Sequence, residues 1–202
     1  MLVLRVGKRQ LAACWAILLP VLLIGCPREP RVTWLANEAY FETLISYMTQ
    51  AQQEIVISMF LFAPGDHEHN RATQVKEALI DATKRGVQVR LLLEVSDGED
   101  FATEANRGVA KELRRQGIIV QFDSPARTTH TKLVIIDQRY VLLGSHNFTH
   151  SALRHNNEAS VLIESPKLAQ QALAYLQRIG GPSAQERISG PEQRRPPTQE
   201  SR

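Results

Sequence analysis

Cysteine is scarce in this 202-residue chain, which contains two, Cys14 and Cys26. Both fall within the first 26 residues, so the rest of the chain has no thiol for a disulfide or for a cysteine-based zinc site. The stability of that part must therefore come from packing. Aromatic residues are also few, at 6%, and they form no evident row on which nucleic-acid bases would stack.

Acidic residues are absent from the first 25 positions, which carry basic charge at Arg5, Lys8 and Arg9. Taking these three from the 24 Lys and Arg leaves 21, equal to the 21 Asp and Glu, so bulk charge indicates no polyanionic partner. A basic start followed by the apolar run 11–24 is typical of a secretory signal. The run is about fifteen residues long, against about twenty for a bilayer span. We therefore predict a signal peptide over residues 1–25.

The end of this segment, Leu23-Ile24-Gly25-Cys26, resembles a bacterial lipobox, in which the cysteine is acylated and becomes the new N-terminus. The resemblance implies an exported, periplasmic lipoprotein that a lipid on Cys26 tethers to the membrane. A soluble periplasmic protein with an ordinary cleaved signal is one alternative, and an uncleaved N-terminal membrane anchor is another. Residues 26–31 are predicted to be a short tether.

Strand and helix patterns alternate along the rest of the chain. Apolar residues recur at helical spacing over 37–53, 71–85, 101–116 and 166–179. Runs rich in β-formers cover 54–62, 87–94, 118–122, 132–136, 140–143 and 159–163. This order predicts an α/β fold, a layered mixed sheet flanked by helices and largely parallel in its first half. We expect one domain over 32–180 and a disordered tail over 181–202, where Pro, Ser, Gln and Arg predominate.

The stretch from His130 to Glu158 concentrates groups that can attack a phosphate ester. It reads His130-Thr-Lys132, Asp137 five residues later, then Gly144-Ser145-His-Asn147, and ends at Glu158. An imidazole can serve as nucleophile or proton donor near pH 7. An ammonium and a carboxamide can hold phosphate oxygens as charge builds on them. The stretch is therefore a candidate catalytic site.

A β-hairpin over 132–143 would bring these groups together. On a strand, residues two apart point to the same face, so His130 and Lys132 should project together. Gly144 then turns the chain and leaves Asn147 at the mouth of the second strand. Glu158 starts the next β-run, which can return to the same end of the sheet.

The spacing H-x-K-x4-D-x6-G-S-x-N resembles the HKD signature of the phospholipase D superfamily. The continuation Asn147-Phe-Thr and Asn156-Asn-Glu158 resembles its small bacterial single-motif endonucleases. This resemblance implies a half-unit that dimerises around one shared site, a phosphohistidine intermediate on His130, and chemistry without a metal or other cofactor. It also implies that Glu158 pairs with the histidine as its orienting carboxylate.

Two residues of the candidate site have a structural alternative. Ser145 either donates to phosphate or shapes the turn after Gly144. Asp137 lies in the hairpin, where capping of the turn is the favoured role and a catalytic role is the alternative. We assign His130, Lys132, Asn147, Glu158, Ser145 and Asp137 to the catalytic site, with Lys132, Ser145 and Asn147 also binding substrate.

Four of the six histidines fall between 130 and 155, so a metal site at His146, His150 and His155 is a rival interpretation. Their spacing matches no metal motif with a clear mechanism, and we assign no metal. Residues 66–69, which contain two more histidines, are predicted to form a solvated loop. The local basic excess, which could guide a phosphate-rich substrate, consists of Arg127, Lys132, Arg139 and Arg154.

One HKD motif supplies one histidine, whereas the chemistry needs two proton-handling groups. The sequence therefore predicts a homodimer in which His130 of each copy meets its mate at a twofold axis. The favoured function is a metal-independent phosphodiesterase, a non-specific endonuclease acting on DNA, with RNA as a second candidate substrate. The alternative is a phospholipase D or cardiolipin-type hydrolase, which a membrane tether would hold close to phospholipid.

Overall fold

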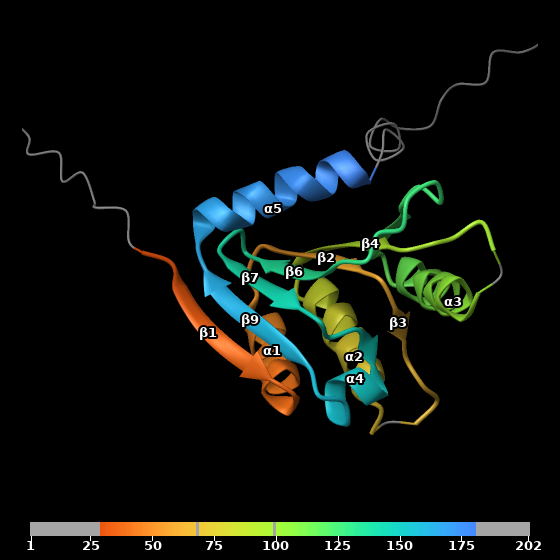
Figure 1. Ribbon diagram of the computed structural model, residues 1–202, viewed down its shortest axis with the longest axis horizontal. Helices are drawn as coiled ribbons and strands as arrows, with labels where there is room; N and C mark the ends of the chain where they lie inside the picture. The colour runs from red at the N-terminus through yellow and green to blue at the C-terminus, as the bar shows by residue number, and fades with distance from the viewer. Residues whose placement is uncertain (1–28, 68, 99, 181–202) are drawn as a thin grey trace, which may run out of the picture.

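The computed structural model describes residues 29–67, 69–98 and 100–180 (Figure 1). The predicted signal peptide, the acylation site Cys26, the start of the tether and the tail 181–202 lie outside these ranges. Within them, no helix is both long enough and apolar enough to cross a membrane. The first strand begins at Arg31, which the sequence had placed in the tether.

A seven-stranded mixed sheet forms the centre of the molecule, in the order β1-β9-β7-β6-β2-β4-β5. Its strands are β1 (Arg31–Ala36), β2 (Glu54–Met59), β4 (Gln88–Leu93), β5 (Ile119–Phe122), β6 (Lys132–Ile136), β7 (Tyr140–Gly144) and β9 (Ala159–Glu164). Strands β2, β4 and β5 are parallel, whereas β6, β7, β9 and β1 pair antiparallel. The predicted layered mixed sheet is thus confirmed.

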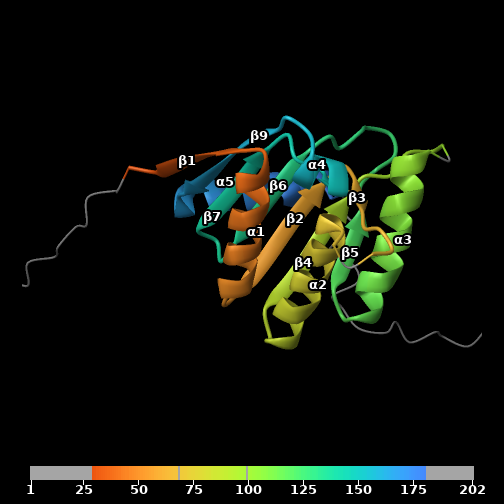
Figure 2. The same cartoon turned by 90° about the horizontal axis from the view of Figure 1, so that it is seen from below.

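Helices cover both faces of this sheet. The long helices are α1 (Glu38–Gln50), α2 (Arg71–Lys84), α3 (Phe101–Arg115) and α5 (Pro166–Ile179). In Figure 2, α1, α2 and α3 lie in front of the sheet and α5 lies behind it. All four correspond to the predicted helices, and their ends differ from the predicted ends by a few residues at most.

The two-residue period of β6 explains why the sheet is covered on both sides. Val134 and Ile136 belong to the main core beneath α1, α2 and α3. Leu133 and Ile135 point the opposite way and pack with Ala169 of α5. A strand buried on both faces has an almost continuous apolar sequence, as residues 132–136 do.

Local signals fix the helix ends. Asn70, Asp100 and Ser165 each accept a hydrogen bond from the N–H three residues later, at 3.1, 2.8 and 3.2 Å respectively. These are N-caps, which satisfy N–H groups that the helix leaves free. Gly86 and Gly117 end α2 and α3 at φ 91° and 82°, a conformation that glycine adopts without strain.

Four short or peripheral elements were not predicted. They are β1, β3 (Phe62–Ala63), β8 (Phe148–Thr149) and α4 (His150–Arg154). Strands β3 and β8 form a separate two-stranded parallel sheet. Strand β1 pairs with β9 at the sheet edge and leaves Val32 and Trp34 more than half exposed. It lacks the buried run by which β2 and β6 are recognised in the sequence.

The strand directions place several chain segments at one edge of the sheet. Strand β6 runs antiparallel to β2, so it starts where β2 ends. Strand β7 ends beside the start of β6, and β9 starts beside the end of β7. The carboxyl ends of β4 and β5 lie at this edge too. Ligands bind at such edges in many α/β folds.

Asp137 lies at the other end of β6, about 16 Å from Lys132 at the usual strand rise. Its carboxylate accepts hydrogen bonds of 2.8–3.2 Å from the backbone N–H groups of Gln52, Gln53 and Glu54. The residue also adopts a left-handed φ of 50°. The Asp137 carboxylate therefore binds the loop between α1 and β2 and not the backbone of its own turn. It lies at the opposite end of β6 from the edge that carries His130.

We expect Asp137→Ala to lower the free energy of unfolding by about 1–3 kcal/mol, because three N–H groups lose a charged acceptor. Alanine is also less suited than aspartate to a left-handed φ. Urea unfolding monitored by circular dichroism measures the change. Asp81→Ala is the control, since Asp81 makes an exposed ion pair with Lys84 that should contribute less than about 1 kcal/mol. A loss of catalysis in Asp137→Ala at unchanged stability would return this residue to the catalytic site.

Candidate active site

His130 and Lys132 form a contact pair at the start of β6. Lys132 Nζ lies 3.1 Å from His130 Nε2 and 3.3 Å from the His130 carbonyl oxygen. An ammonium group has only donors, so Lys132 donates to Nε2, and a neutral imidazole carries its proton on Nδ1. His130 is exposed, whereas Lys132 is 7% exposed. The pair thus presents a nitrogen lone pair and a positive charge at one point of the surface.

Phe60, which follows β2, supports both side chains. Its ring meets the His130 ring edge to face, with centroids 4.4 Å apart. Lys132 Nζ lies 4.8 Å from the centroid of the same ring, a cation–π distance. This role of Phe60 was not predicted, because the residue lay inside a run predicted to be a buried strand.

Asn106 of α3 in turn fixes the backbone around Phe60. Its Nδ2 donates to the carbonyl oxygens of Phe60 and Glu94, both at 2.8 Å, and its Oδ1 accepts from Phe62 N at 2.8 Å. The residue is fully buried. It was missed, although an Asn on the buried stripe of a helix, three residues before Val109, is a signal that could have found it.

The surroundings of the pair favour a neutral imidazole. Burial and the positive charge of Lys132 both lower the pKa of His130. Burial lowers the pKa of Lys132, and the negative charge of Glu158 opposes this effect. Since an unperturbed histidine titrates near pH 6.5, His130 is mainly unprotonated at neutral pH.

Ser145 and Glu158 are in direct contact at the same edge. Ser145 Oγ donates to the Glu158 carboxylate and accepts from Ala159 N at 3.0 Å. The carboxylate also accepts from Asn156 Nδ2 at 3.1 Å. In the described ranges Glu158 makes no hydrogen bond to His130, so its orienting role stays a prediction. The Ser145 hydroxyl joins the ends of β7 and β9, and its binding of phosphate also stays a prediction.

Asn147 lies between β7 and β8. Its Oδ1 atom is buried and has no hydrogen-bond partner in the described part of the chain. Buried amide oxygens normally accept a hydrogen bond from the scaffold, so this oxygen is free to bind another group. His130, Lys132, Ser145, Asn147 and Glu158 thus come from three segments that meet at one edge of the sheet.

The three histidines of the alternative metal site, His146, His150 and His155, do not come together. His146 is fully buried, hydrogen-bonded to Ser160 Oγ at 2.7 Å and to the Asn37 carbonyl oxygen at 3.0 Å. Its ring also stacks on Tyr40 at 4.2 Å. His150 and His155 lie elsewhere, on and after α4. Among the described residues, no group of three or more His, Cys, Asp or Glu is placed to hold a metal ion.

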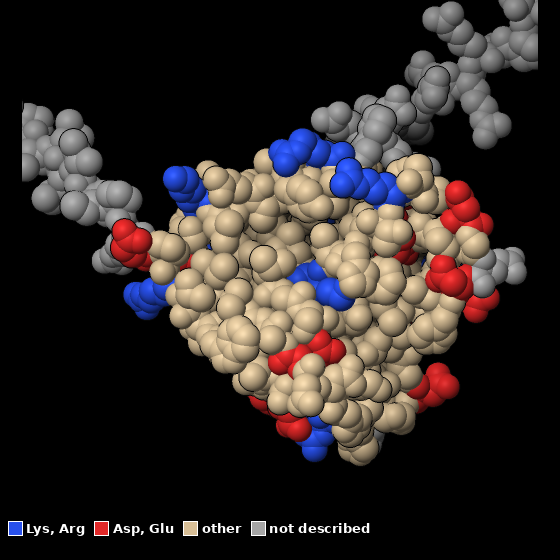
Figure 3. Space-filling model, in the orientation of Figure 1, with Lys and Arg blue, Asp and Glu red and all other residues tan. Residues whose placement is uncertain are grey.

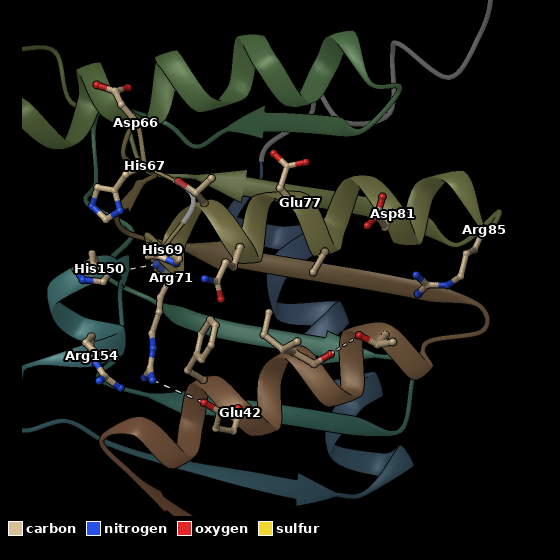
Figure 4. Close-up of a pocket in the computed structure, with 16 residues that line it drawn as sticks. Glu42, Asp66, His67, His69, Arg71, Glu77, Asp81, Arg85, His150 and Arg154 are labelled. Carbon is tan, nitrogen blue, oxygen red and sulfur yellow. Dashed lines mark hydrogen bonds and ion pairs between the residues drawn. The ribbon is translucent and has the colours of Figure 1, made fainter.

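A groove of about 1180 Å³ runs between α1 and α2 (Figure 4). His67 and His150 line one end and Arg85 the other. Arg71 crosses it and pairs with Glu42 at 3.7 Å. The groove carries both signs of charge, and no residue assigned to the catalytic site lines it.

The basic excess seen in the sequence does not form one patch. Arg139 pairs with Glu164 beside the hairpin, and Arg154 pairs with Glu38 at 2.8 Å. On the face shown in Figure 3, Lys and Arg appear at separate places on a mostly uncharged surface. Guidance of a phosphate-rich substrate by this local excess therefore finds no support in the arrangement of the side chains.

Comparisons with known proteins identify a family model and several relatives that this chain resembles. The family model described as "Cardiolipin synthase, PLD-like domain" matches residues 44–179. A phospholipase D from Rickettsia bellii is 39% identical over 103 residues, which cover 51% of this chain and 47% of that protein. A mitochondrial cardiolipin hydrolase from Chlamydomonas reinhardtii is 27% identical over 144 residues, covering 71% and 58% respectively. The chain spans about half the length of the Rickettsia proteins it matches.

Two solved structures share the fold over most of their length. The phospholipase D family member Nuc from Salmonella typhimurium superposes with a TM-score of 0.63 at 27% identity, covering 75% of this chain and 94% of that one. NucT from Helicobacter pylori gives a TM-score of 0.59 at 18% identity, covering 75% and 96%. At that identity, the second match supports the fold alone.

Proposed function

The chain belongs to the phospholipase D superfamily, and we propose that it is a metal-independent phosphodiesterase, most simply a non-specific endonuclease. The observation that carries the proposal is the contact between Lys132 Nζ and His130 Nε2, 3.1 Å apart at an accessible sheet edge. It places an unprotonated nucleophile beside a cation that can hold the oxygens of the phosphorus under attack.

In the proposed reaction His130 Nε2 attacks phosphorus, and the bond to the leaving oxygen breaks as the N–P bond forms. A second, protonated imidazole gives its proton to the leaving oxygen. That imidazole then takes a proton from water, the resulting hydroxide attacks phosphorus, and the N–P bond breaks. Lys132 and Asn147 hold the phosphate oxygens throughout.

The second imidazole is proposed to be His130 of another copy of this chain. The sequence contains one H-x-K motif, and His130 is exposed, so an equivalent residue can approach it. A twofold axis beside His130 would build one complete site from two incomplete ones. The homodimer is therefore part of the proposal.

Two substrate classes compete. Nucleic acid is supported by the resemblance of residues 147–158 to small bacterial single-motif endonucleases and by the likeness to Nuc over 94% of that chain. Phospholipid is supported by relatives named phospholipase D and cardiolipin hydrolase and by the predicted acylation of Cys26. Export to the periplasm and this lipid anchor stay proposals, since they concern residues outside the described part.

The deciding experiment incubates the purified protein in EDTA with plasmid DNA, single-stranded DNA, RNA and cardiolipin vesicles. We expect cleavage of nucleic acid at a rate that EDTA does not change. Cleavage of cardiolipin alone would assign the enzyme to phospholipid. Complete loss of turnover in EDTA, regained with a divalent metal, would contradict the metal-free mechanism.

A further inference from the structure

Two carboxyl groups lie side by side behind the candidate nucleophile. Glu94 follows β4 and Asp123 follows β5, and the last paired residues of these parallel strands are Leu93 and Phe122. Glu94 is 4% exposed and Asp123 is 7% exposed. The two side chains are close enough for a hydrogen bond, which needs a proton on one of them because two ionised carboxylates have no donor.

The pair holds the backbone next to His130. Thr129 N donates to Glu94 Oε2, and Thr129 directly precedes His130. Asp123 Oδ1 accepts from Val95 N at 2.9 Å. The two carboxyls thus connect the ends of β4 and β5 to the segment that leads into β6.

One proton between the two groups accounts for their burial. Asp123 Oδ2 is buried and has no hydrogen-bond partner within the described ranges, and no ion pair with Lys, Arg or His is found there for either carboxyl. Ionisation of both members of a buried carboxyl pair is unfavourable, because the two like charges repel each other. Burial and the hydrogen bond to Asp123 raise the pKa of Glu94 to about 7, against the opposing bond from Thr129 N.

We propose that Glu94 and Asp123 share one proton and that this singly protonated pair is a positioning element for His130. The inference rests on the proposed function in one respect, the role of His130 as nucleophile. While the pair holds one proton, a hydrogen bond joins Asp123 to Glu94. Glu94 then stays in place to accept the hydrogen bond from Thr129 N. When the proton is lost, the two carboxylates repel each other and Thr129 is released.

Charged groups around Glu94 act in the same direction. Asp123 faces it from β5, and the exposed carboxylate of Asp100 acts on it from the start of α3. Both are negative, so both oppose ionisation of Glu94. Positioning should therefore weaken as the pH rises through about 7 and be intact below it.

The first test needs neither substrate nor mutation. We expect hydrogen-exchange protection of the Thr129 amide, corrected for the intrinsic effect of pH, to fall by about tenfold or more between pH 6 and pH 8.5. Glu94→Gln should keep this protection constant, because its amide donates to Asp123 at every pH and its oxygen still accepts from Thr129. Protection that declines equally in both proteins would overturn the proposal.

Catalysis gives the second test, in a comparison of Glu94→Gln with Glu94→Ala. The glutamine variant should retain turnover and extend it to higher pH, whereas alanine should lower kcat by about tenfold or more with little change in KM. Glu54→Gln is the matched control, since Glu54 is equally buried but pairs with Arg90 at the start of β2. Glu94→Ala with wild-type kcat and wild-type Thr129 protection would contradict the positioning role.

Stability supplies a third readout. A raised pKa in the folded state means that the contribution of Glu94 is present at low pH and lost as the pH rises to about 7. The unfolding free energy of Glu94→Gln relative to wild type should therefore increase from pH 5 to pH 8. A difference that stays flat with pH would contradict a shared proton. Since exchange and stability need no substrate, they stand apart from any failure of the phosphodiesterase assignment.

Discussion

His130→Asn is expected to lower phosphodiester turnover by at least about 10⁴-fold, because the proposed mechanism takes both its nucleophile and its general acid from this residue. Asparagine has no lone pair basic enough to attack phosphorus and no proton that titrates near neutral pH. Initial rates on plasmid DNA and on cardiolipin vesicles, with enzyme in excess for the variant, measure the loss.

The fold should be unaffected by this change. His130 is exposed, and its ring contacts are with Phe60 and Lys132, so we expect the unfolding temperature and the sedimentation coefficient of the dimer to stay at wild-type values. His155→Asn is the matched control, an exposed histidine in contact with His150. Activity near wild type in His130→Asn would mean that the nucleophile has been misidentified.

Mixed dimers separate a shared site from two independent ones. When equal amounts of wild-type and His130→Asn subunits assemble at random, about one quarter of the dimers contain two intact histidines. At equal total protein concentration, the activity of the mixture should therefore be about one quarter of that of the pure wild type. A value near one half, or an active monomer in sedimentation, would contradict the shared site.

Lys132→Gln is the second large effect, expected at about 10²–10³-fold in kcat, because the charge that stabilises the phosphate oxygens is removed. The same substitution should raise the pKa of His130, since the positive charge of Lys132 is one of the causes that lower it. NMR titration of the imidazole measures this shift without substrate. Its direction follows from electrostatics alone, because a nearby cation disfavours the protonated ring.

Lys76→Gln is the control for this experiment. Lys76 is also a largely covered lysine, with 17% side-chain exposure, but it pairs with Glu112 at 2.7 Å between α2 and α3. Its loss should leave both kcat and the His130 titration unchanged. If Lys132→Gln left the pKa of His130 where it was, the contact between the two side chains would not exist in solution.

The parts of the fold that follow a regular period were predictable from the sequence. Strand β6 could be predicted from its apolar run, and α2 and α3 from helical spacing that ends at Gly86 and Gly117. Strand β1 could not be, because its side chains Val32 and Trp34 remain exposed and its pairing partner lies far along the chain. Pairing between distant segments leaves no local period to detect.

The candidate site divides in the same way. His130 lies two residues before Lys132, the first residue of β6, and their contact was expected from the alternation of side chains in an extended segment. The support from Phe60 and Glu94 could not be predicted, because each comes from a different segment and meets the site through tertiary contacts alone. Asp137 is close to His130 in the sequence, but β6 lies between them and places Asp137 at the opposite end of the strand from the site.

The pairing of β1 with β9 has a consequence for when the enzyme can first act. Asn37 directly follows β1, and its side-chain oxygen accepts a hydrogen bond of 2.9 Å from the backbone N–H of Glu158. Its carbonyl oxygen is hydrogen-bonded to the buried His146 imidazole at 3.0 Å. These contacts need the first strand and the ninth in register, from Arg31 against Glu164 to Ala36 against Ala159. A chain emerging from the ribosome therefore lacks the anchor of Glu158 until nearly all of the domain has appeared. The proposed active site can be complete only after β9 has paired with β1.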